Sequence, residues 1–350
     1  YIKQPDGSHI NIDYDERGNM IKITDEMNNN LVYKYDSLNR ITGITDGNGN
    51  HTKYYYNEQN DLIKIKNAFD RELIYEYGAN GKVTQITDFD GTTQKMWYDS
   101  CNRPIRYENQ EGNIAEFTRD KLGNLICEKM PNGAETHFVY DRNNKMIAYI
   151  DPMGGKTKFA YDACGNCIRI EDAEGHIKKY SYDSLNRVIE ETDANNNCIK
   201  YSYDEEGHLT SIIDVLGNQR TIEYDKSGRK IREINALGNV ANYSYNSLGK
   251  ISQIDDGMGN VVFYEYYYGG LLKCINYPNG HRINYSYDGN RNVIEKWDEQ
   301  EYHLYYDYDE LNRIVSIRSN EGQKIKYGYD AVGNVTSIID VEGNITKYTY

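Results

Sequence analysis

The residues best suited to chemistry in this sequence are Cys164 and Cys167, which enclose Gly165 and Asn166, with His176 nine residues further on. Thiolate and imidazole groups bind zinc, but a zinc site normally needs four ligands, and no second Cys-x-x-Cys or paired histidine stands at a suitable spacing. Cys164 falls in an expected turn, and Cys167 falls at a position that is apolar in most of the repeats described below. We therefore expect both cysteines to be structural, and we expect no metal, redox centre or other cofactor.

Aspartates that precede glycine also raise the question of calcium, which prefers carboxylate and carbonyl oxygens. The ligand order of an EF-hand and the glycine-rich nonapeptide of calcium β-rolls are both missing from the sequence. The seven histidines are spread along the chain and show no pattern of a nucleophile with its base. We expect the aspartates to cap turns, and we expect no catalytic residue and no enzyme activity.

An uninterrupted repeat of 21 residues explains where these aspartates stand. Steps of 21 from Tyr14 to Tyr350 meet tyrosine at sixteen of seventeen places, and only Arg119 departs. No insertion or deletion breaks this frame, so every turn must have a fixed length. We count this tyrosine as position 0 and interpret residues 1–350 as a single array of about seventeen repeats. The structural tyrosines of the array are Tyr14, Tyr35, Tyr56, Tyr77, Tyr98, Tyr140, Tyr161, Tyr182, Tyr203, Tyr224, Tyr245, Tyr266, Tyr287, Tyr308 and Tyr329.

Each repeat carries two turns of the form Asp-x-x-Gly/Asn. Position 1 is Asp in twelve of sixteen complete repeats, and position 4 is Gly or Asn in fifteen. A second Asp is frequent at position 11, and position 14 is Gly in twelve repeats. Aspartate accepts backbone hydrogen bonds at the start of a turn, whereas Gly or Asn tolerates the left-handed conformation near its end. Such turns join antiparallel strands into hairpins.

Alternating residues between the turns indicate strands. Position 7 is Ile, Val or Thr in fourteen repeats, position 9 is Ile in ten, and position 19 is Tyr or Phe in fourteen. Because 21 is odd, either one turn differs in loop parity or the strand carries a bulge; otherwise side chains would change face from repeat to repeat. An even loop at the first turn would place Tyr161 opposite Ile168 and, one repeat earlier, Tyr140 opposite Ile147. It would also place Phe159 opposite Ile170, which gathers Tyr, Phe and Ile on one face.

The number of expected strands predicts a curved sheet. About thirty-three strands at a spacing of roughly 4.8 Å would form a ribbon on the order of 160 Å wide. Twisted sheets of that breadth do not stay flat. The chain shows no helical period, so the predicted fold class is all-β: tandem 21-residue antiparallel hairpins in a curved or spiral sheet.

Charge and hydropathy exclude two classes of partner. The net charge of −14 and the pI of about 5.0 argue against nucleic acid, which is bound through clustered Lys and Arg. No stretch approaches 18 consecutive apolar residues, so no membrane span is expected. The chain starts at Tyr1 without an initiator Met or a signal peptide, and we interpret it as a fragment of a longer protein whose export signal lies elsewhere.

The run Tyr-Asp-x-x-Gly/Asn-Arg with a following apolar residue recurs at 35–41, 182–188 and 308–314. This motif resembles the Rhs (rearrangement hot spot) or YD-repeat family of toxin-complex shells, wall-associated bacterial toxins and, more distantly, teneurins. The resemblance covers the whole chain. It implies a secreted or cell-surface bacterial protein in which a hairpin ribbon forms part of a hollow shell. Such a shell encapsulates or presents a C-terminal effector, so the partner would be the remainder of the same polypeptide, including its core segment and toxin.

Self-cleavage is not expected to carry over from that family. The run Asp151-Pro152-Met153-Gly154 is similar to the Asp-Pro-x-Gly element of the family's self-cleaving core segment. It falls at positions 11 to 14, however, where every repeat has its second turn. We therefore expect an ordinary turn at this place.

A carbohydrate-binding or cell-wall-binding module for adhesion is the alternative function. Exposed tyrosine rings can stack on sugars while Asn and Asp bind their hydroxyls, and cell-surface glycans would then be the partner. Repeats that bind cell walls are usually richer in tryptophan, whereas this chain has only Trp97 and Trp297.

Overall fold

The computed structural model describes residues 1–350, which fold into 34 strands of one sheet. The helical content is one 3-10 turn, η1 (Tyr268–Gly270). The structure contains no helix with the length and apolar character needed to cross a bilayer. The predicted all-β fold is confirmed. The strands are β1 (Ile2–Lys3), β2 (His9–Tyr14), β3 (Met20–Thr24), β4 (Asn30–Tyr35), β5 (Ile41–Thr45), β6 (His51–Tyr56), β7 (Leu62–Lys66), β8 (Glu72–Tyr77), β9 (Val83–Thr87), β10 (Thr93–Tyr98), β11 (Pro104–Glu108), β12 (Ile114–Arg119), β13 (Leu125–Lys129), β14 (Glu135–Tyr140), β15 (Met146–Ile150), β16 (Lys156–Tyr161), β17 (Cys167–Glu171), β18 (Ile177–Tyr182), β19 (Val188–Thr192), β20 (Cys198–Tyr203), β21 (Leu209–Ile213), β22 (Gln219–Tyr224), β23 (Lys230–Ile234), β24 (Val240–Tyr245), β25 (Ile251–Asp255), β26 (Val261–Tyr266), β27 (Leu272–Asn276), β28 (Arg282–Tyr287), β29 (Val293–Asp298), β30 (His303–Tyr308), β31 (Ile314–Ser319), β32 (Lys324–Tyr329), β33 (Val335–Ile339) and β34 (Ile345–Lys347).

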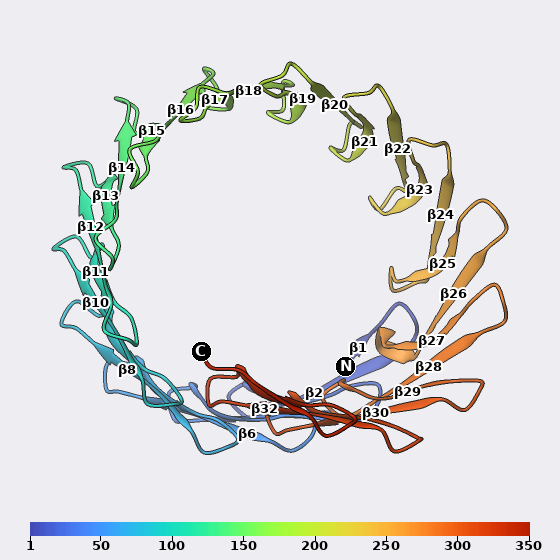
Figure 1. Cartoon of the computed structure of the whole chain (residues 1–350). Coiled ribbons are helices and arrows are strands. Elements are labelled where there is room, and N and C mark those ends of the chain that lie inside the picture. The colour runs from blue at the N-terminus through green and yellow to red at the C-terminus, as the bar shows by residue number, and fades with distance from the viewer. The chain divides into compact units, whose positions relative to one another are not determined.

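Contacts divide the chain into two compact units. Unit 1 combines Tyr1–Thr93 with Ser244–Tyr350, and unit 2 is Gln94–Tyr243. Within each unit a strand pairs antiparallel with the strands before and after it in the chain, as Figure 1 shows for β12 to β23. The first strand β1 pairs with β2 and the last strand β34 pairs with β33. The sheet is therefore unclosed.

Both turns of a repeat have the same geometry. The N–H of the first turn residue donates to the carbonyl of the fifth, and the N–H of the fourth donates to the carbonyl of the first, at 36–40 and again at 46–50. The fourth residue is left-handed, with φ of 61° at Asn39 and 89° at Gly49, which explains the choice of Asn or Gly there. The run from Asp151 to Gly155 makes the same two bonds, so the Asp-Pro-Met-Gly element is an ordinary second turn as expected.

A β-bulge beside position 0 accommodates the odd period, and it corrects the predicted register. Tyr161 pairs with Cys167 rather than Ile168, and the register shifts between Ala160 and Tyr161. In the preceding repeat Tyr140 likewise pairs with Met146 rather than Ile147. The two predicted pairs are wrong because both turns have the same odd loop. The parity is absorbed by position 7, which becomes the extra residue of the bulge.

The bulge keeps aromatic and aliphatic residues on one face. The predicted pair of Phe159 with Ile170 is confirmed. Another repeat shows how the face continues, because Tyr54 pairs with Ile65, and Ile65 pairs with Leu73 across the next turn. Positions 0, 6, 9, 17 and 19 thus share one side, which we call the aromatic face. Positions 8, 10, 16, 18 and 20 form the opposite, polar face.

The core is thin, because a single sheet has no second layer to pack against. The hydrophobic residues that are buried include Ala115, Ala148, Ile222 and Cys274, most of them small. The remaining apolar side chains are half-buried against their neighbours in adjacent strands. Stability in such an array comes from contacts between successive repeats, so the residues that link repeats are the candidate functional residues.

Candidate functional site

The aspartate at position 1 closes the first turn of its own repeat. Asp183 follows β18, and its Oδ1 accepts the N–H of Leu185 at 2.9 Å and the N–H of Arg187 at 3.0 Å. Its Oδ2 accepts Nε of Arg187 at 2.7 Å. The N–H of Arg187 lowers the pKa of Asp183, desolvation opposes this change, and the guanidinium lowers the pKa further. The carboxylate is thus the fixed centre of the turn.

The arginine at position 5 then connects this turn to the next repeat. One terminal nitrogen of Arg187 donates to the carbonyl of Asp204 at 3.1 Å, and its guanidinium lies 4.7 Å from the ring centroid of Tyr203. The guanidinium therefore touches Asp183 in its own repeat and both residues of the Tyr-Asp pair in the following one. The same ring contact occurs in the pairs Arg40 with Tyr56 and Arg313 with Tyr329.

The tyrosine at position 0 closes the end of a strand ladder that the bulge leaves open. Pairing between β19 and β20 stops at Glu190 and Lys200, so the carbonyl of Val188 lies beyond the ladder. The hydroxyl of Tyr203 donates to this carbonyl at 2.9 Å. The equivalent bond is made by Tyr35, Tyr56, Tyr77, Tyr161, Tyr182, Tyr224, Tyr266, Tyr287, Tyr308 and Tyr329.

Position 0 departs from this pattern at the start of the array and where tyrosine is replaced. Tyr14, in the first complete repeat, is exposed. Arg119 replaces tyrosine and donates to the carbonyl of Gly123 in its own turn.

A second kind of link joins hairpins that are distant in the sequence. The tripeptide Asp-Gly-Asn occurs twice in the chain, at 46–48 and 288–290, and the two copies face each other within unit 1. Nδ2 of Asn48 donates to Asp288 at 2.9 Å, and Nδ2 of Asn290 donates to Asp46 at 2.7 Å. The N–H of Asn48 also donates to Oδ1 of Asn290 at 3.3 Å. We call this pair of turns the Asp-Gly-Asn clasp.

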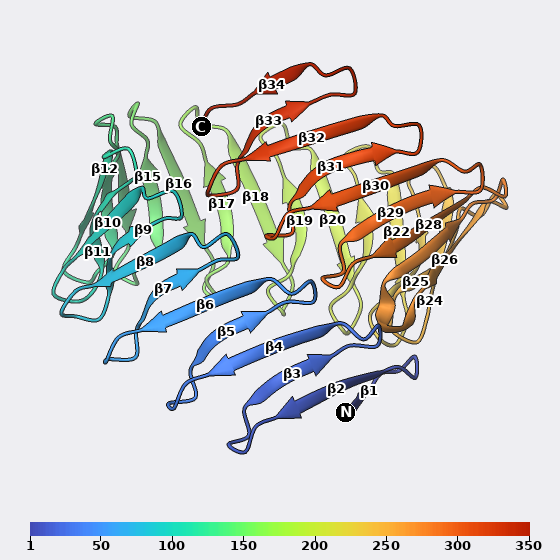
Figure 2. The same cartoon turned by 90° about the horizontal axis from the view of Figure 1, so that it is seen from below.

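The two glycines of the clasp allow the backbones to meet. A β-carbon on Gly47 would collide with the carbonyl of Gly289, and one on Gly289 would collide with the carbonyl of Gly47. Figure 2 shows the two segments of unit 1 side by side, with β4 to β8 in blue and β28 to β32 in orange and red.

Further contacts extend this junction on both sides of the clasp. Arg291 pairs with Asp25 at 3.1 Å and with Glu26 at 3.3 Å. The N–H of Gly269 donates to Asp6 at 2.9 Å. In each case a second turn of the N-terminal segment meets a first turn of the C-terminal segment. The two rims of the ribbon in unit 1 are therefore complementary to each other.

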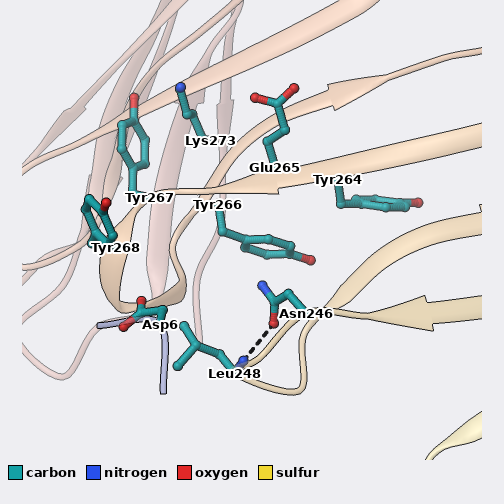
Figure 3. A pocket seen from close by; sticks show the side chains of 9 residues that line it. All are labelled: Asp6, Asn246, Leu248, Tyr264, Glu265, Tyr266, Tyr267, Tyr268 and Lys273. Atoms are coloured by element: carbon teal, nitrogen blue, oxygen red, sulfur yellow. Dashed lines mark hydrogen bonds between the residues drawn. The ribbon is translucent and has the colours of Figure 1, made fainter. Parts of the chain in front are cut away.

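A pocket in unit 1 gathers aromatic side chains near the same junction. Tyr264, Tyr266, Tyr267 and Tyr268 line it together with Glu265, Lys273, Asn246, Leu248 and Asp6 (Figure 3). Tyr266 and Tyr267 are held by bonds to the carbonyls of Ile251 and Tyr285, whereas Tyr268 is 69% exposed. The pocket thus places aromatic rings beside carboxylate, amide and ammonium groups.

The cysteines singled out from the sequence are not brought into a ligand cluster. Cys164 is exposed in a first turn, Cys167 pairs with Tyr161, and His176 bonds Asp172 at 3.0 Å. Two other groups bring three potential ligands together: Cys127 with Glu135 and His137, and Asp204 with Glu206 and His208.

Sequence reasoning missed the clasp and both ligand groups. Two identical Asp-Gly-Asn tripeptides are visible in the sequence, but nothing in a 21-residue period tells that turns 242 residues apart will meet. Cys127 and His137 become recognisable as a pair once the hairpin register is known. The one sequence signal available for the clasp was that Asp-Gly-Asn occurs at these two places and nowhere else in the chain.

These features define a structural hairpin-repeat protein whose motif residues link one repeat to the next. The chain belongs to the YD-shell family: the family model described as Teneurin YD-shell matches residues 43–178 and 135–291, which is more than half of the chain. The model described as RHS Repeat matches residues 14–51 and 308–350. Both matches confirm the resemblance inferred from the Tyr-Asp motif, and membership of this family indicates a structural role. None of the curated proteins matches the chain in sequence.

Solved structures of toxin-complex proteins have the same fold. The crystal structure of TcdB2-TccC3-TEV superimposes with a TM-score of 0.77 at 13% identity, over 94% of this chain and 21% of that chain. TcdB2-TccC3 without its hypervariable C-terminal region gives 0.76 at 14% identity, over 95% of this chain and 22% of that chain. A Tc holotoxin pore of Photorhabdus luminescens gives 0.61 at 14% identity, over 94% and 23%. The chain thus spans about a fifth of the length of these proteins.

Proposed function

We propose that residues 1–350 act as one repeat array, a wall segment of a secreted or cell-surface shell that encapsulates or presents a C-terminal effector. The partner in this proposal is the remainder of the same polypeptide. The tyrosines at position 0 are its structural residues, and no residue of the array has a catalytic role.

One observation carries the proposal: the motif residues are used in links between repeats. The polar atoms of these residues form hydrogen bonds to the backbone or side chains of the same or an adjacent repeat, as for Tyr203, Asp183 and Arg187. A repeat whose recurring motif residues hold its neighbours suits a wall. The two complementary rims in unit 1 support the same role, because rim contacts let hairpins that are distant in the sequence hold one another without a second layer.

The shell role can be tested with residues 1–350 and with the longer polypeptide. Purified residues 1–350 should show no turnover in hydrolase and nuclease panels, and should resist protease as a folded array. In the longer polypeptide, a C-terminal segment should be protected from protease while Tyr203→Ala and Arg187→Ala together should expose it. Turnover by residues 1–350, or equal digestion of the C-terminal segment in both forms, would count against a shell.

The tyrosine-lined pocket favours a second candidate function, glycan binding for adhesion. Tyr268 is the informative residue, because it lines the pocket, is largely exposed, and can be replaced without removing the bonds of Tyr266 and Tyr267. A glycan array would be probed with the native chain, with Tyr268→Ala, and with Tyr302→Ala as an exposed control outside the pocket. Binding that is lost in Tyr268→Ala and kept in the control would support adhesion.

A further inference from the structure

The hairpin of β13 and β14 places three metal-ligand side chains on its polar face. Cys127 lies directly opposite His137, and Lys129 lies opposite Glu135. Glu135 precedes His137 by two residues, so both side chains project from the same side of β14. The second turn between the strands fixes this register through its own hydrogen bonds, and the ligands therefore sit on a preformed hairpin.

The distances suit a small divalent ion. The ligand atoms of the three side chains lie within 4.8 Å of one another, and Nε2 of His137 is 3.5 Å from Oε2 of Glu135. Metal bonds of about 2.0 to 2.3 Å would hold tetrahedral ligand atoms roughly 3.3 to 3.7 Å apart. The remaining approach is about 1 Å, which rotation of exposed side chains can supply. Glu135 and His137 are 42% and 49% exposed.

The repeat itself does not require these residues. Positions 8, 16 and 18 carry Cys, Glu and His together in this repeat alone. Position 18 is more often lysine, as at Lys53, Lys95, Lys158, Lys179, Lys200, Lys326 and Lys347. The same repeat is also the one in which Arg119 replaces the tyrosine at position 0. This repeat therefore departs from the common pattern on both faces of the sheet.

The local charges also fit a dication. Lys129 is 3.6 Å from Oε1 of Glu135, which leaves Oε2 on the side of His137. A Cys127 thiolate and the Glu135 carboxylate carry two negative charges, the Lys129 ammonium carries one positive charge, and a neutral imidazole adds none, so the group has a net charge of −1 before the ion binds. When the ion binds, the S–H bond of Cys127 breaks, a metal–sulfur bond forms, and the proton leaves to solvent.

We propose that Cys127, Glu135 and His137 bind one zinc-type divalent ion, with water as the fourth ligand. Thiolate, imidazole and carboxylate are the donor set that zinc takes from proteins, and three protein ligands leave one position open. The proposal is independent of the shell function. It predicts that the ion ties the second-turn ends of β13 and β14 together.

The test uses residues 1–350 stripped with a chelator and then given zinc or cobalt alone. Zinc should bind at one equivalent per chain in calorimetry, and cobalt should give a thiolate charge-transfer band. Cys127→Ser and His137→Lys should each remove both signals. These residues occur at the same positions in other repeats, as Ser211 and Lys158, so the hairpin should still fold. The affinity should fall by more than the roughly 10- to 100-fold that loss of an outer-shell partner costs.

Two control variants distinguish this site from the other candidate metal ligands in the chain. The pair Cys164→Ser with Cys167→Ser removes the Cys-x-x-Cys thiols, and His208→Arg breaks the Asp204 group while restoring the arginine common at position 5. Both should bind one zinc as the native chain does. Zinc binding below one equivalent, binding that survives His137→Lys, or binding lost in either control would overturn the proposal. Circular dichroism of each variant checks that the array remains folded.

Discussion

Replacement of Gly47 by alanine should open the Asp-Gly-Asn clasp. The added β-carbon would collide with the carbonyl of Gly289, so the two turns must move apart. Gly47 is not among the glycines with a left-handed φ, so alanine does not strain the turn of residue 47 itself. The substitution therefore acts on the contact between the turns rather than on the conformation of one turn.

The clasp bonds set the size of the effect. Separation breaks the bond of Asn48 to Asp288, the bond of Asn290 to Asp46, and the longer bond between Asn48 and Asn290. The two amide–carboxylate bonds contribute about 1 kcal/mol each between partly exposed groups, so the clasp should lose roughly 2 kcal/mol. That loss corresponds to a rise of roughly 30-fold in the open fraction.

Hydrogen exchange measures this opening directly. Amides in peptides 46–50 and 288–292 should exchange faster by about that factor in Gly47→Ala, and similarly in Gly289→Ala. The double variant should be no worse than either single one, because both break the same contact. Gly43→Ala in β5 is the matched control, since its added β-carbon would meet neighbours no closer than 3.7 Å. Additive effects of the two clasp variants, or exchange unchanged from the native chain, would refute the reasoning.

Three further outcomes are expected. Tyr182→Phe removes one hydroxyl bond and should cost about 1 kcal/mol of unfolding free energy, whereas Tyr55→Phe, at an exposed position 20, should be nearly neutral in the same denaturant titration. The side-chain hydrogen bond from Arg103, together with the weaker effect of the Arg103 backbone N–H, lowers the pKa of Asp99 from 3.8 to about 2. The stabilisation from this carboxylate is thus complete above about pH 4 and is lost as pH falls through 2; melting temperatures that stay constant from pH 5 to pH 2 would contradict this. Ile168→Thr, at the exposed bulge, should change the free energy of unfolding by less than about 0.5 kcal/mol. Ile170→Thr, on the aromatic face, should lower it by more than about 1 kcal/mol. Equal melting temperatures for the two variants would instead favour the even-loop register, in which Tyr161 lies opposite Ile168.

Much of the local structure follows from the sequence because it depends on residues close together in the chain. The period of 21, the aspartate that opens each turn and the Gly or Asn that ends it predict hairpins with fixed boundaries. These predictions hold at 36–40 and 46–50, and also at Arg291, which is left-handed at φ 68° although it is neither Gly nor Asn. The Tyr-Asp motif likewise predicts the family, because its spacing is what one repeat needs to hold the next.

The tertiary structure decided the register and every long-range contact. The parity of 21 requires either an unequal turn or a bulge, and the sequence does not choose between them; the structure has a bulge that pairs Tyr161 with Cys167. Contacts between residues that are far apart, such as Asn48 with Asp288, have no counterpart in a local pattern, because they depend on how the ribbon of unit 1 is placed against itself. The grouping of Cys127 with His137 depends on the same register, since a slip of one residue would send these side chains to opposite faces.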